Sequence, residues 1–504
     1  MDFRQVLGVS NRRRTRLVEI LYYNREGTSS EQLTSELHCS LPVLLNDINL
    51  INTQQDSFFV EKDKGVYRVK LKEDISIGKL YSSALTTSPE FQILEQLLYE
   101  QHDNIGSLSK ALFLSSSNTQ RYLKKMEDIL QQADIKLCYR PLRLEGRESV
   151  VRHFFFLYFI EKQYALKTVL PDVKEYQLSA IEKFVQEFTE INGLHKKYIY
   201  QKRMTYNVFI SLWRIKNGHP YPKEELRTNG LVLSTDETAK LFRDMVSEAY
   251  QLNLTEEMMR DCLWLSFSDA IVFSKEHREL ALKDNPRYKE LFMAHRTMTE
   301  QFTQLMVGSF EEERILEITT LLVNDHYLFD EKGEFLTILR KSRAIFIKMV
   351  KIMHKQSVEK VLGIAKEFVR THKIYQSEDF IINYAYLLLT AEADSLERLA
   401  SQENTVHLLI LSDLSPTEEE FITNVISQIV YGNFEIHHFK DAWYGEEEMN
   451  KKILTYDGLI TTGSREDLPK DFPMVLMDPY VTPQAIVAIQ NLVNELSERE
   501  NIQN

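Results

Sequence analysis

The chain contains few of the residues that mark several large classes of protein. Its 504 residues include only three cysteines, Cys39, Cys138 and Cys262, which are widely separated. This spacing excludes a disulfide framework and a CxxC metal site, and it is expected for a protein of a reducing cytoplasm. We therefore predict a cytoplasmic protein that holds no metal and no cofactor.

Long hydrophobic runs are also missing. The longest candidates, at 154–160 and 385–390, are far shorter than the roughly 18 apolar residues that a membrane helix needs. The basic cluster at 12–14 is not followed by the apolar core of a signal peptide. The sequence therefore predicts no contact with a membrane.

Glycine and proline are sparse, with 16 and 12 residues, whereas 43% of the chain is hydrophobic and 27% is charged. Such a composition is typical of a globular protein rather than a fibrous or low-complexity one. A chain of this length is too long for a single hydrophobic core, so three to five domains are expected.

The net charge of −13 is unusual for a protein that binds DNA, but it is unevenly distributed. Residues 1–150 hold 20 lysines and arginines against 20 acidic residues, whereas residues 401–504 hold 6 against 18. The acidity therefore belongs to the C-terminal part. At the other end, a basic arm is predicted to precede the first helix, and its Arg12, Arg13 and Arg14 either contact phosphate or are simply solvated.

Residues 105–131 have the spacing of a helix-turn-helix. Apolar residues at Ile105, Leu108 and Leu112 predict one short helix, and Ser115 is placed to cap a second. The predicted buried stripe of the second helix is Thr119, Leu123, Met126 and Leu130. On its exposed face, Ser116, Ser117 and Gln120 are predicted to lie at base edges, and Arg121, Lys124 and Lys125 at phosphates. The alternative is an ordinary helical hairpin with a solvated basic face.

A second copy of this pattern lies at residues 29–52, where Ser40 is expected to cap a helix that has Pro42 in its first turn. Asn46 and Asn49 of that helix are predicted to play a lesser part in DNA binding, because the helix has no cation. Each copy continues into an alternating strand pair, at 58–69 and at 135–144, with turns at 63–65 and near Pro141. Two winged helix-turn-helix units are therefore predicted, joined by an irregular connection at 70–89.

The remaining sequence has the hydrophobic spacing of helices up to about residue 400 and then that of alternating strands and helices. From about 150 to 400 it predicts helices at 148–164, 176–191, 199–216, 236–251, 256–275, 286–307, 311–325, 333–354, 356–371 and 378–398, which we assign to two bundles. Beyond 402, strands at 406–411, 434–436, 458–461 and 473–477 alternate with helices. This order predicts a small α/β domain with a mostly parallel sheet.

This arrangement resembles the Mga/AtxA family of virulence regulators of Gram-positive bacteria. The resemblance covers essentially the whole chain and is most specific at 115–125 (SSSNTQRYLKK), 144–152 (LEGRESVVR) and 203–220 (RMTYNVFISLWRIKNGHP). It implies phosphotransferase-system regulation domains in the bundles and an enzyme IIB-like last domain. The implied division is 1–85 and 86–147 for the winged units, 148–285 and 286–401 for the regulation domains, and 402–504 for the last domain.

The chain departs from the family pattern at the positions that carry phosphate. Regulation domains usually place a phosphorylatable histidine where this chain has Asn207, and Asn383 occupies the comparable place in the second bundle. Asparagine has no nucleophilic imidazole nitrogen, so these two sites cannot accept phosphate. The remaining candidate phosphorylation sites are His219, His295, His326 and His372; the alternative for each is a structural histidine.

The last domain also lacks the cysteine that enzyme IIB subunits phosphorylate after their first strand. Residues 412–415 hold the loop where that cysteine would lie, and no cysteine follows residue 262. We therefore predict a protein that is not an enzyme, in which this domain is vestigial, structural or dimerising. The resulting hypothesis is a transcriptional regulator, most consistent with an activator linked to virulence or carbohydrate, that acts as a homodimer on promoter DNA, A·T-rich or curved. Alternatives are a phosphotransferase-system signalling protein that works with the general proteins of that system, or a protein-interaction scaffold without direct DNA binding.

Overall fold

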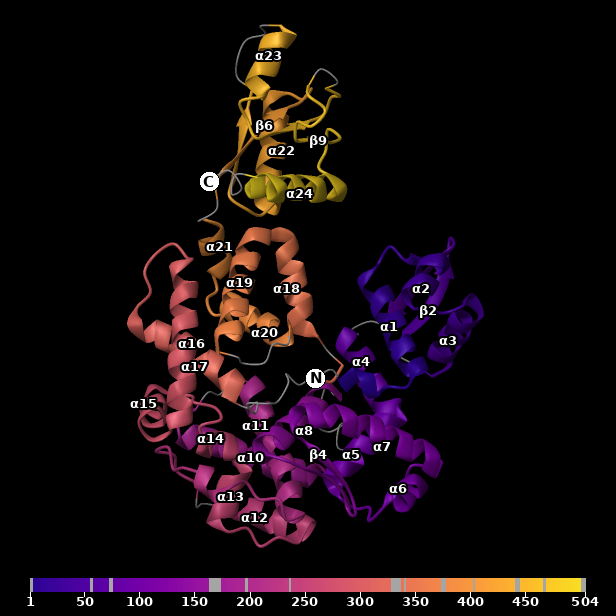
Figure 1. Cartoon of the computed structure of the whole chain (residues 1–504), viewed down its shortest axis with the longest axis vertical. Helices are drawn as coiled ribbons and strands as arrows, with labels where there is room; N and C mark the ends of the chain where they lie inside the picture. The colour runs from indigo at the N-terminus through magenta and orange to yellow at the C-terminus, as the bar shows by residue number, and fades with distance from the viewer. Residues whose placement is uncertain are drawn as a thin grey trace. The chain divides into compact units, whose positions relative to one another are not determined.

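The computed structural model describes residues 3–54, 58–71, 76–162, 174–194, 198–234, 237–327, 337–339, 341–372, 378–401, 404–439, 445–465 and 468–499. The chain divides into two compact units, residues 1–290 with 324–341 and residues 291–323 with 342–504. Most elements are helices, and a parallel sheet lies near the C-terminus (Figure 1). The predicted fold class, mainly helical with winged helices and a C-terminal α/β domain, is confirmed.

The first winged unit has the predicted helix-turn-helix and strand pair, together with a 3-10 helix, a helix and a short strand that the sequence analysis did not predict. It consists of η1 (Phe3–Val6), α1 (Val9–Tyr23), β1 (Thr28–Ser29), α2 (Ser30–Glu36), α3 (Leu41–Gln54), β2 (Phe58–Asp63) and β3 (Val66–Leu71). Strands β2 and β3 pair antiparallel, and β1 pairs with the outer side of β3. Their turn places Lys64 and Gly65 at positive φ, as in a two-residue hairpin.

The predicted basic arm is wrong, because the arginines of residues 12–14 lie inside α1. This helix buries Leu17, Val18, Ile20 and Leu21 in the core of the first unit, against Leu44 of α3. An apolar face of this kind stabilises a helix through its tertiary packing more than through local propensity. The arginines therefore occupy the first turns of a packed helix.

The second winged unit contains one helix that the sequence analysis missed. Helix α4 (Ile77–Thr87) occupies most of the predicted irregular connection, and it buries Leu80, Tyr81 and Leu85. Serines and threonines within it have low intrinsic helix propensity, which hides the short apolar stripe. The Tyr81 hydroxyl donates to Glu19 of α1 at 2.6 Å, and the Ser82 hydroxyl donates to the carbonyl of Lys162. Helix α4 therefore connects the first winged unit to the helix that follows the second.

The rest of the second winged unit agrees with the prediction. It comprises α5 (Pro89–Tyr99), α6 (Ile105–Ala111), α7 (Ser116–Leu130), η2 (Gln131–Ala133), β4 (Lys136–Tyr139) and β5 (Leu142–Glu145). Strands β4 and β5 form an antiparallel wing, and the Leu142 amide donates to the His102 carbonyl at 3.0 Å. The wing is therefore attached to the loop between α5 and α6.

After the two winged units, the first compact unit continues with a series of helices and a short η3 (Lys223–Glu225). These helices are α8 (Glu148–Lys162), α10 (Glu175–Ile191), α11 (Tyr198–Lys216), α12 (Glu237–Tyr250), α13 (Glu256–Cys262), α14 (Trp264–Phe267) and α15 (Lys275–Asp284). The predicted single helix at 256–275 is wrong. The chain turns after α14 because buried Asp269 binds His277 and Asn285 of the next segment, and Ser274 caps α15. A capping serine and a buried hydrogen-bonded carboxylate favour a turn over a continued helix.

The boundary between the two units falls within α16 (Pro286–Gln304) and α17 (Glu312–Tyr327). The second unit continues with α18 (Ser342–Met353), α19 (Lys355–His372), α20 (Glu378–Leu389) and α21 (Ser395–Ala400). Part of the predicted helix 333–354, residues 333–336 and 340, lies outside the described residues. The predicted helix 378–398 is interrupted after Leu389 and resumes at Ser395.

The C-terminal domain contains β6 (Val406–Leu411), α22 (Pro416–Ile429), β7 (Phe434–His438), α23 (Glu446–Ile453), β8 (Gly458–Thr461), β9 (Met474–Leu476) and α24 (Pro483–Arg499). The strands have the order β7-β6-β8-β9, and every pair is parallel. Helices α22 and α24 pack on one face of the sheet, and α23 packs on the other. This is the α/β domain that the sequence predicted.

The α/β domain is attached to the helices of its own unit through α24. The side-chain amide of Gln490 donates to the Met353 carbonyl at 3.2 Å, and that of Asn494 donates to the Ile352 carbonyl at 2.9 Å. These bonds satisfy carbonyls at the end of α18, which have no partner within their own helix. In the described part of the chain, no helix is long and apolar enough to span a bilayer.

Candidate nucleic-acid interface

Helix α7 is positioned by its own sequence as the second helix of a helix-turn-helix. Its N-cap, Ser115, accepts a hydrogen bond from the Asn118 amide at 3.2 Å. The predicted stripe is buried: Leu123, Met126 and Leu130 are fully enclosed, and the Thr119 hydroxyl accepts a hydrogen bond from Ser109 of α6 at 2.9 Å. The opposite face of α7 is therefore left for solvent or a ligand.

The exposed face of α7 forms one wall of an open groove with a volume of about 1260 Å³. The tip of the β4–β5 wing and the N-terminal end of α6 provide the other walls. Five predicted residues lie together in this groove: Ser117, Gln120, Arg121, Lys124 and Lys125. The other lining residues are Asp103, Asn104, Ile105, Gly106, Asp128, Tyr139, Arg140 and Pro141. Ser116 is exposed on the first turn of α7 but is not part of the lining.

The three cations of α7 differ in whether a carboxylate of the chain already pairs with them. The Lys124 ammonium lies 2.9 Å from Glu127 and 3.3 Å from Asp128, and its hydrogen bonds to these carboxylates raise its pKa. The Arg121 guanidinium lies over the Tyr122 ring at 5.4 Å. Among the described residues, neither Arg121 nor Lys125 has a carboxylate partner. These two side chains therefore retain more of their charge for an anion.

Sequence reasoning missed Arg140 at the tip of the wing. Arg140 is exposed and lines the groove, whereas Arg143 on β5 is paired with Glu145. A basic residue beside the turn proline, Pro141, was the available signal. Tyr139, the last residue of β4, also lines the groove, and burial and the nearby Glu127 carboxylate raise the pKa of its hydroxyl to about 12. The wing thus adds one cation opposite those of α7.

The first winged unit presents a weaker surface. Asn46 and Asn49 are exposed on α3, as predicted, but no lysine or arginine lies on this helix. Arg13 and Arg14 both contact Asp47 of α3, whose side chain is only 2% exposed. Arg12 is exposed on α1. Of the predicted arginines, Arg13 and Arg14 thus join α1 to α3, and Arg12 faces the solvent.

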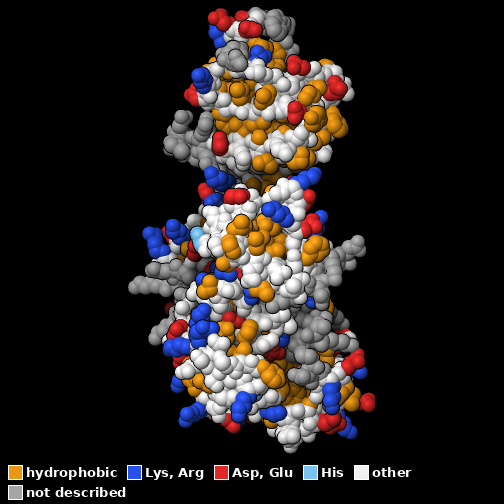
Figure 2. All heavy atoms as spheres, turned by 90° about the vertical axis from the view of Figure 1, so that its right-hand side faces the viewer, with side chains coloured by type: hydrophobic (Ala, Val, Ile, Leu, Met, Phe, Trp, Pro, Cys, Tyr) orange, Lys and Arg blue, Asp and Glu red, His pale blue; other side chains and the backbone are white. Residues whose placement is uncertain are grey.

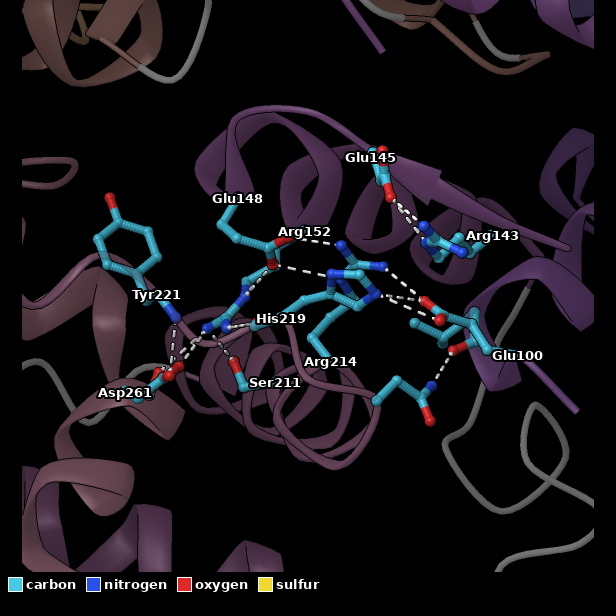
Figure 3. A network of polar contacts seen from close by, with 12 residues as sticks. Glu100, Arg143, Glu145, Glu148, Arg152, Ser211, Arg214, His219, Tyr221 and Asp261 are labelled. Atoms are coloured by element: carbon cyan, nitrogen blue, oxygen red, sulfur yellow. Dashed lines mark hydrogen bonds and ion pairs between the residues drawn. The ribbon is translucent and has the colours of Figure 1, made fainter. Parts of the chain in front are cut away.

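A buried ion network joins the second winged unit to the first helical region (Figure 3). Arg152 of α8 and Arg214 of α11 are both fully buried. Both guanidiniums bind Glu148, the first residue of α8. Arg152 also reaches Asp261 of α13 and the Ser211 hydroxyl. Because every buried charge here has at least one partner of opposite sign, the cost of desolvating these groups is partly offset.

The network reaches the loop that forms one rim of the groove. Arg214 donates to Glu100 at 3.0 Å, and the His219 ring nitrogen lies at the same distance from this carboxylate. Asn217 donates to the carbonyls of Leu98 and Tyr99. Leu98 and Tyr99 end α5, and residues 100–104 connect it to α6, whose first residues line the groove. The end of α11 therefore holds the loop from which α6 and the wing are positioned.

The pKa values of Glu148 and Asp261 are shifted in opposite directions. Burial by itself would raise the pKa of Glu148, but Arg214 and Arg152 outweigh it and hold this pKa below its ordinary value. At Asp261, burial raises the pKa although Arg152 opposes the shift. Glu148, with two guanidinium partners, is therefore more firmly ionised than Asp261.

The candidate phosphorylation sites have different surroundings. His219 is bound to Glu100 as described, and His326 is buried. His295 is fully buried between the Leu291 carbonyl and the Tyr384 hydroxyl. His372 is exposed at the end of α19, beside the Phe368 ring. Asn207 and Asn383 are both buried, and Asn207 donates to the Arg203 carbonyl at 2.8 Å.

The loop after the first strand of the C-terminal domain satisfies its own amides. The Asp413 amide donates to Thr462 at 3.0 Å, and the Ser415 amide donates to Glu418 at 3.0 Å. Ser415 and Glu418 form a reciprocal capping box at the start of α22. Amides that are used in this way are not directed at an anion, and the nearby carboxylates disfavour one.

Two winged helix-turn-helix units, one of them with an open basic groove, define a DNA-binding regulator of transcription. Residues 73–159, which include all of the second winged unit, match the family model of the Mga helix-turn-helix domain. A protein of Streptococcus pneumoniae serotype 4, described as a trans-acting regulator, is 22% identical over 479 residues, 91% of this chain and 92% of its own length.

Two regulators of Bacillus anthracis are also similar. The capsule synthesis positive regulator AcpA is 25% identical over 304 residues, 58% of this chain and 61% of its own. The capsule synthesis positive regulator AcpB is 19% identical over 436 residues, 83% of this chain and 86% of its own. The resemblance to the Mga/AtxA family that was predicted from the sequence is confirmed by these matches.

Proposed function

We propose that the chain is a cytoplasmic activator of transcription that binds double-stranded promoter DNA through the groove of its second winged unit. The observation that carries this proposal is the convergence of Arg121, Lys125 and Arg140 on one groove beside the N-terminus of α7. AcpA and AcpB are both described as positive regulators of capsule synthesis. We further propose that the regulated genes are virulence-linked or carbohydrate-linked, and we expect A·T-rich or curved promoters as the targets.

The geometry of the groove suits a duplex. A recognition helix places its N-terminal residues at base edges, and flanking cations meet the phosphates. Here Ser116, Ser117 and Gln120 occupy the N-terminal half of α7, followed by Arg121 and the lysines. Arg140 on the wing lies on the other side of the groove, where an adjacent stretch of backbone would run.

The test measures affinity for fluorescent A·T-rich promoter DNA at several salt concentrations. Arg121→Ala removes one phosphate contact, so it should weaken binding to all sequences roughly tenfold and reduce the salt slope by about one unit. Arg140→Ala should act in the same way. Lys366→Ala is the control, because Lys366 is an exposed cation of α19 outside the winged units.

Unchanged affinity and salt slope in Arg121→Ala would mean that α7 is not the docking helix. If the full chain binds no duplex at all, a protein-interaction scaffold becomes the better interpretation. Binding of duplex by the wild-type chain supports a transcriptional regulator, whereas no binding supports a scaffold. One titration of the wild-type chain therefore distinguishes the two interpretations.

The five-domain division remains our proposal for the organisation of the chain, with the two helical regions as regulation domains that sense sugar state or support a dimer. Asn207 and Asn383 lack the nucleophile for phosphoryl transfer, so phosphoregulation at these positions is expected to be absent. Incubation with the general phosphotransferase proteins and labelled phosphoenolpyruvate tests this. Label mapped to His219, His326 or His372 would overturn it, and exposed His372 is the first place to look.

We also propose a homodimer in which the C-terminal domain supplies much of the interface. Figure 2 shows hydrophobic side chains on the visible face of this domain, in the upper part of the view. Phe421, Ile429 and Tyr431 of the first helix region are 69%, 45% and 47% exposed, and so are available to a partner. Ile422, Ile489 and Val493 are buried against the sheet and are not available to a partner. The domain is acidic, so association must depend on apolar contact.

Sedimentation of the full chain and of a version that ends near residue 402 tests the dimer. Loss of the dimer in the shorter chain is expected, and equal dimer affinity would place the interface in the helical regions. Because the truncation also exposes the carbonyls that α24 covers, Phe421→Ser in the full chain is the second variant. Leu454→Ser is its control, since Leu454 is a similarly exposed residue elsewhere in the domain.

A further inference from the structure

Two histidines and a glutamate meet on one face of the C-terminal sheet. His407 is on β6, whereas Glu435 and His437 are on β7, the neighbouring edge strand. The parallel register places His407 opposite Glu435 and Leu409 opposite His437. Side chains two residues apart on a strand share a face, so all three project from the face on which α23 packs.

The atoms of this cluster are spaced like the ligands of one metal ion. His407 Nδ1 and His437 Nε2 are 3.1 Å apart, and Glu435 Oε2 lies 3.6 Å and 3.5 Å from them. A tetrahedral zinc ion holds nitrogen and oxygen ligands at about 2.0–2.2 Å, which separates neighbouring ligand atoms by roughly 3.3 Å. We propose that His407, Glu435 and His437 bind one zinc ion.

A direct hydrogen bond between the two imidazoles accounts for less of this geometry. Such a bond would use a single N–H and would explain only the distance between the two rings. Glu435 lies too far from either nitrogen for a normal hydrogen bond, which has a length of about 2.7–3.2 Å. An ion at the centre accounts for all three distances at once.

The surroundings suit a cation that arrives from solvent. The side chains of His407, Glu435 and His437 are 49%, 61% and 37% exposed, so an ion can reach them without unfolding the domain. The Tyr456 ring lies beside that of His437, with ring centroids 5.4 Å apart, and limits its movement. Residues 401–504 hold 18 acidic residues against 6 basic ones, and this excess attracts cations.

The donor set favours zinc among the common biological cations. Two imidazoles and one carboxylate are borderline ligands, whereas magnesium and calcium prefer oxygen atoms only. Three protein ligands leave a fourth position, which water fills. Because the ligands come from two strands, the bound ion would link the edge strand β7 to β6 and stabilise this side of the sheet.

The experiment is calorimetric titration of zinc chloride into the full chain at pH 7.5. One zinc ion per chain is expected. His407→Ala, His437→Ala and Glu435→Gln should each weaken binding by at least about tenfold, and the double histidine variant should abolish it. Glu435→Gln changes the most exposed ligand, so it is the variant least able to disturb folding. His438→Ala is the matched control, because His438 is on the same strand but binds Glu419 instead.

Two further readouts keep the result unambiguous. Zinc should raise the unfolding temperature of the wild-type chain and leave that of the double histidine variant unchanged. Binding should weaken at pH 5.5, because the imidazoles must lose their protons to bind the ion. Wild-type protein that binds no zinc at about 100 µM free metal would overturn the proposal, as would the same zinc affinity in all variants.

Discussion

Three consecutive arginines in α1 have different surroundings and should therefore respond differently to substitution. Arg13 hydrogen bonds to Asp47, a contact that raises its pKa, and Arg14 lies 3.7 Å from the same carboxylate. Arg12 faces solvent. One basic cluster in the sequence thus contains both structural and available charges.

Arg13→Ala should destabilise the first winged unit by about 3 kcal/mol, because it leaves buried Asp47 without its main partner. Arg12→Ala should leave the unfolding free energy unchanged and at most weaken DNA binding. Urea unfolding followed by circular dichroism measures the first effect, and the DNA titration measures the second. Equal stability of the two variants would contradict this assignment.

Glu127 partly neutralises the positive charge of α7. Its carboxylate accepts hydrogen bonds from Lys124 and from the Tyr139 hydroxyl. Glu127→Gln keeps an acceptor for Tyr139 but removes one of the two negative charges beside Lys124, so Lys124, left with Asp128 alone, becomes more available to phosphate. We expect DNA binding that is roughly threefold to tenfold tighter, with a steeper salt dependence. Glu190→Gln, an exposed substitution on α10, is the control; unchanged affinity for Glu127→Gln would place Lys124 outside the interface.

At the scale of elements, the end of α11 holds the loop between α5 and α6 in place. Arg214 binds Glu148 and Glu100, and this last residue ends α5 with a left-handed backbone at φ 52°. Helix α6 and the wing follow from that loop and line the groove. Displacement of this helix end would therefore be transmitted to the groove that we propose as the DNA-binding surface.

Arg214→Met should cost about 3–5 kcal/mol of stability, because it removes one partner from a buried network and leaves two carboxylates short of a cation. DNA affinity should fall as well, since the groove loses support at one rim. Arg314→Met is the control: Arg314 is 41% exposed in its contacts with Glu317 and Glu392, so its loss should cost less than about 1 kcal/mol. Thermal unfolding and the DNA titration measure the two effects, and equal costs for both variants would count against the network.

Elements were predicted well where one local pattern decides them. Helix α7 has an N-cap and a buried stripe in its own sequence, and the structure has both. Helix α4 was missed because its serines and threonines obscured a stripe that becomes meaningful only against α1 and α8. The break after α14 was missed because Asp269 finds its partners in the next helix. Long-range contacts of this kind leave no local periodicity.

At the scale of the whole molecule, acid stability should depend on His295. Burial lowers the pKa of this residue to about 4 from an ordinary value of 6.5, while its ring is held between Leu291 and Tyr384. The unfolded chain therefore binds one more proton than the folded chain between these two pH values. The contribution of the neutral His295 ring to the free energy of unfolding is therefore complete above pH 6.5 and is lost as the pH falls toward 4.

The loss should amount to about 3 kcal/mol for this one group. In His295→Gln, an uncharged side chain replaces the imidazole, so the pH dependence of unfolding between pH 7 and 5 should become shallower. Thermal unfolding as a function of pH measures this slope. His372→Gln, which changes an exposed histidine of the same unit, should keep the slope of the wild-type chain. The assignment would be refuted if His372→Gln had the shallower slope and His295→Gln kept the wild-type slope.

The sequence by itself determined the helix-turn-helix and wing pattern, the order of strands and helices in the C-terminal domain, the cap and stripe of α7, and the absence of a phosphoryl acceptor at Asn207 and Asn383. These depend on residue identity and on spacing within a few turns, which are local properties. Only the tertiary structure decided which charges are free, because Arg13 meets Asp47 and Arg214 meets Glu100 across long separations in the chain. The same reason applies to His407 and His437, which are 30 residues apart and become neighbours only when β6 pairs with β7.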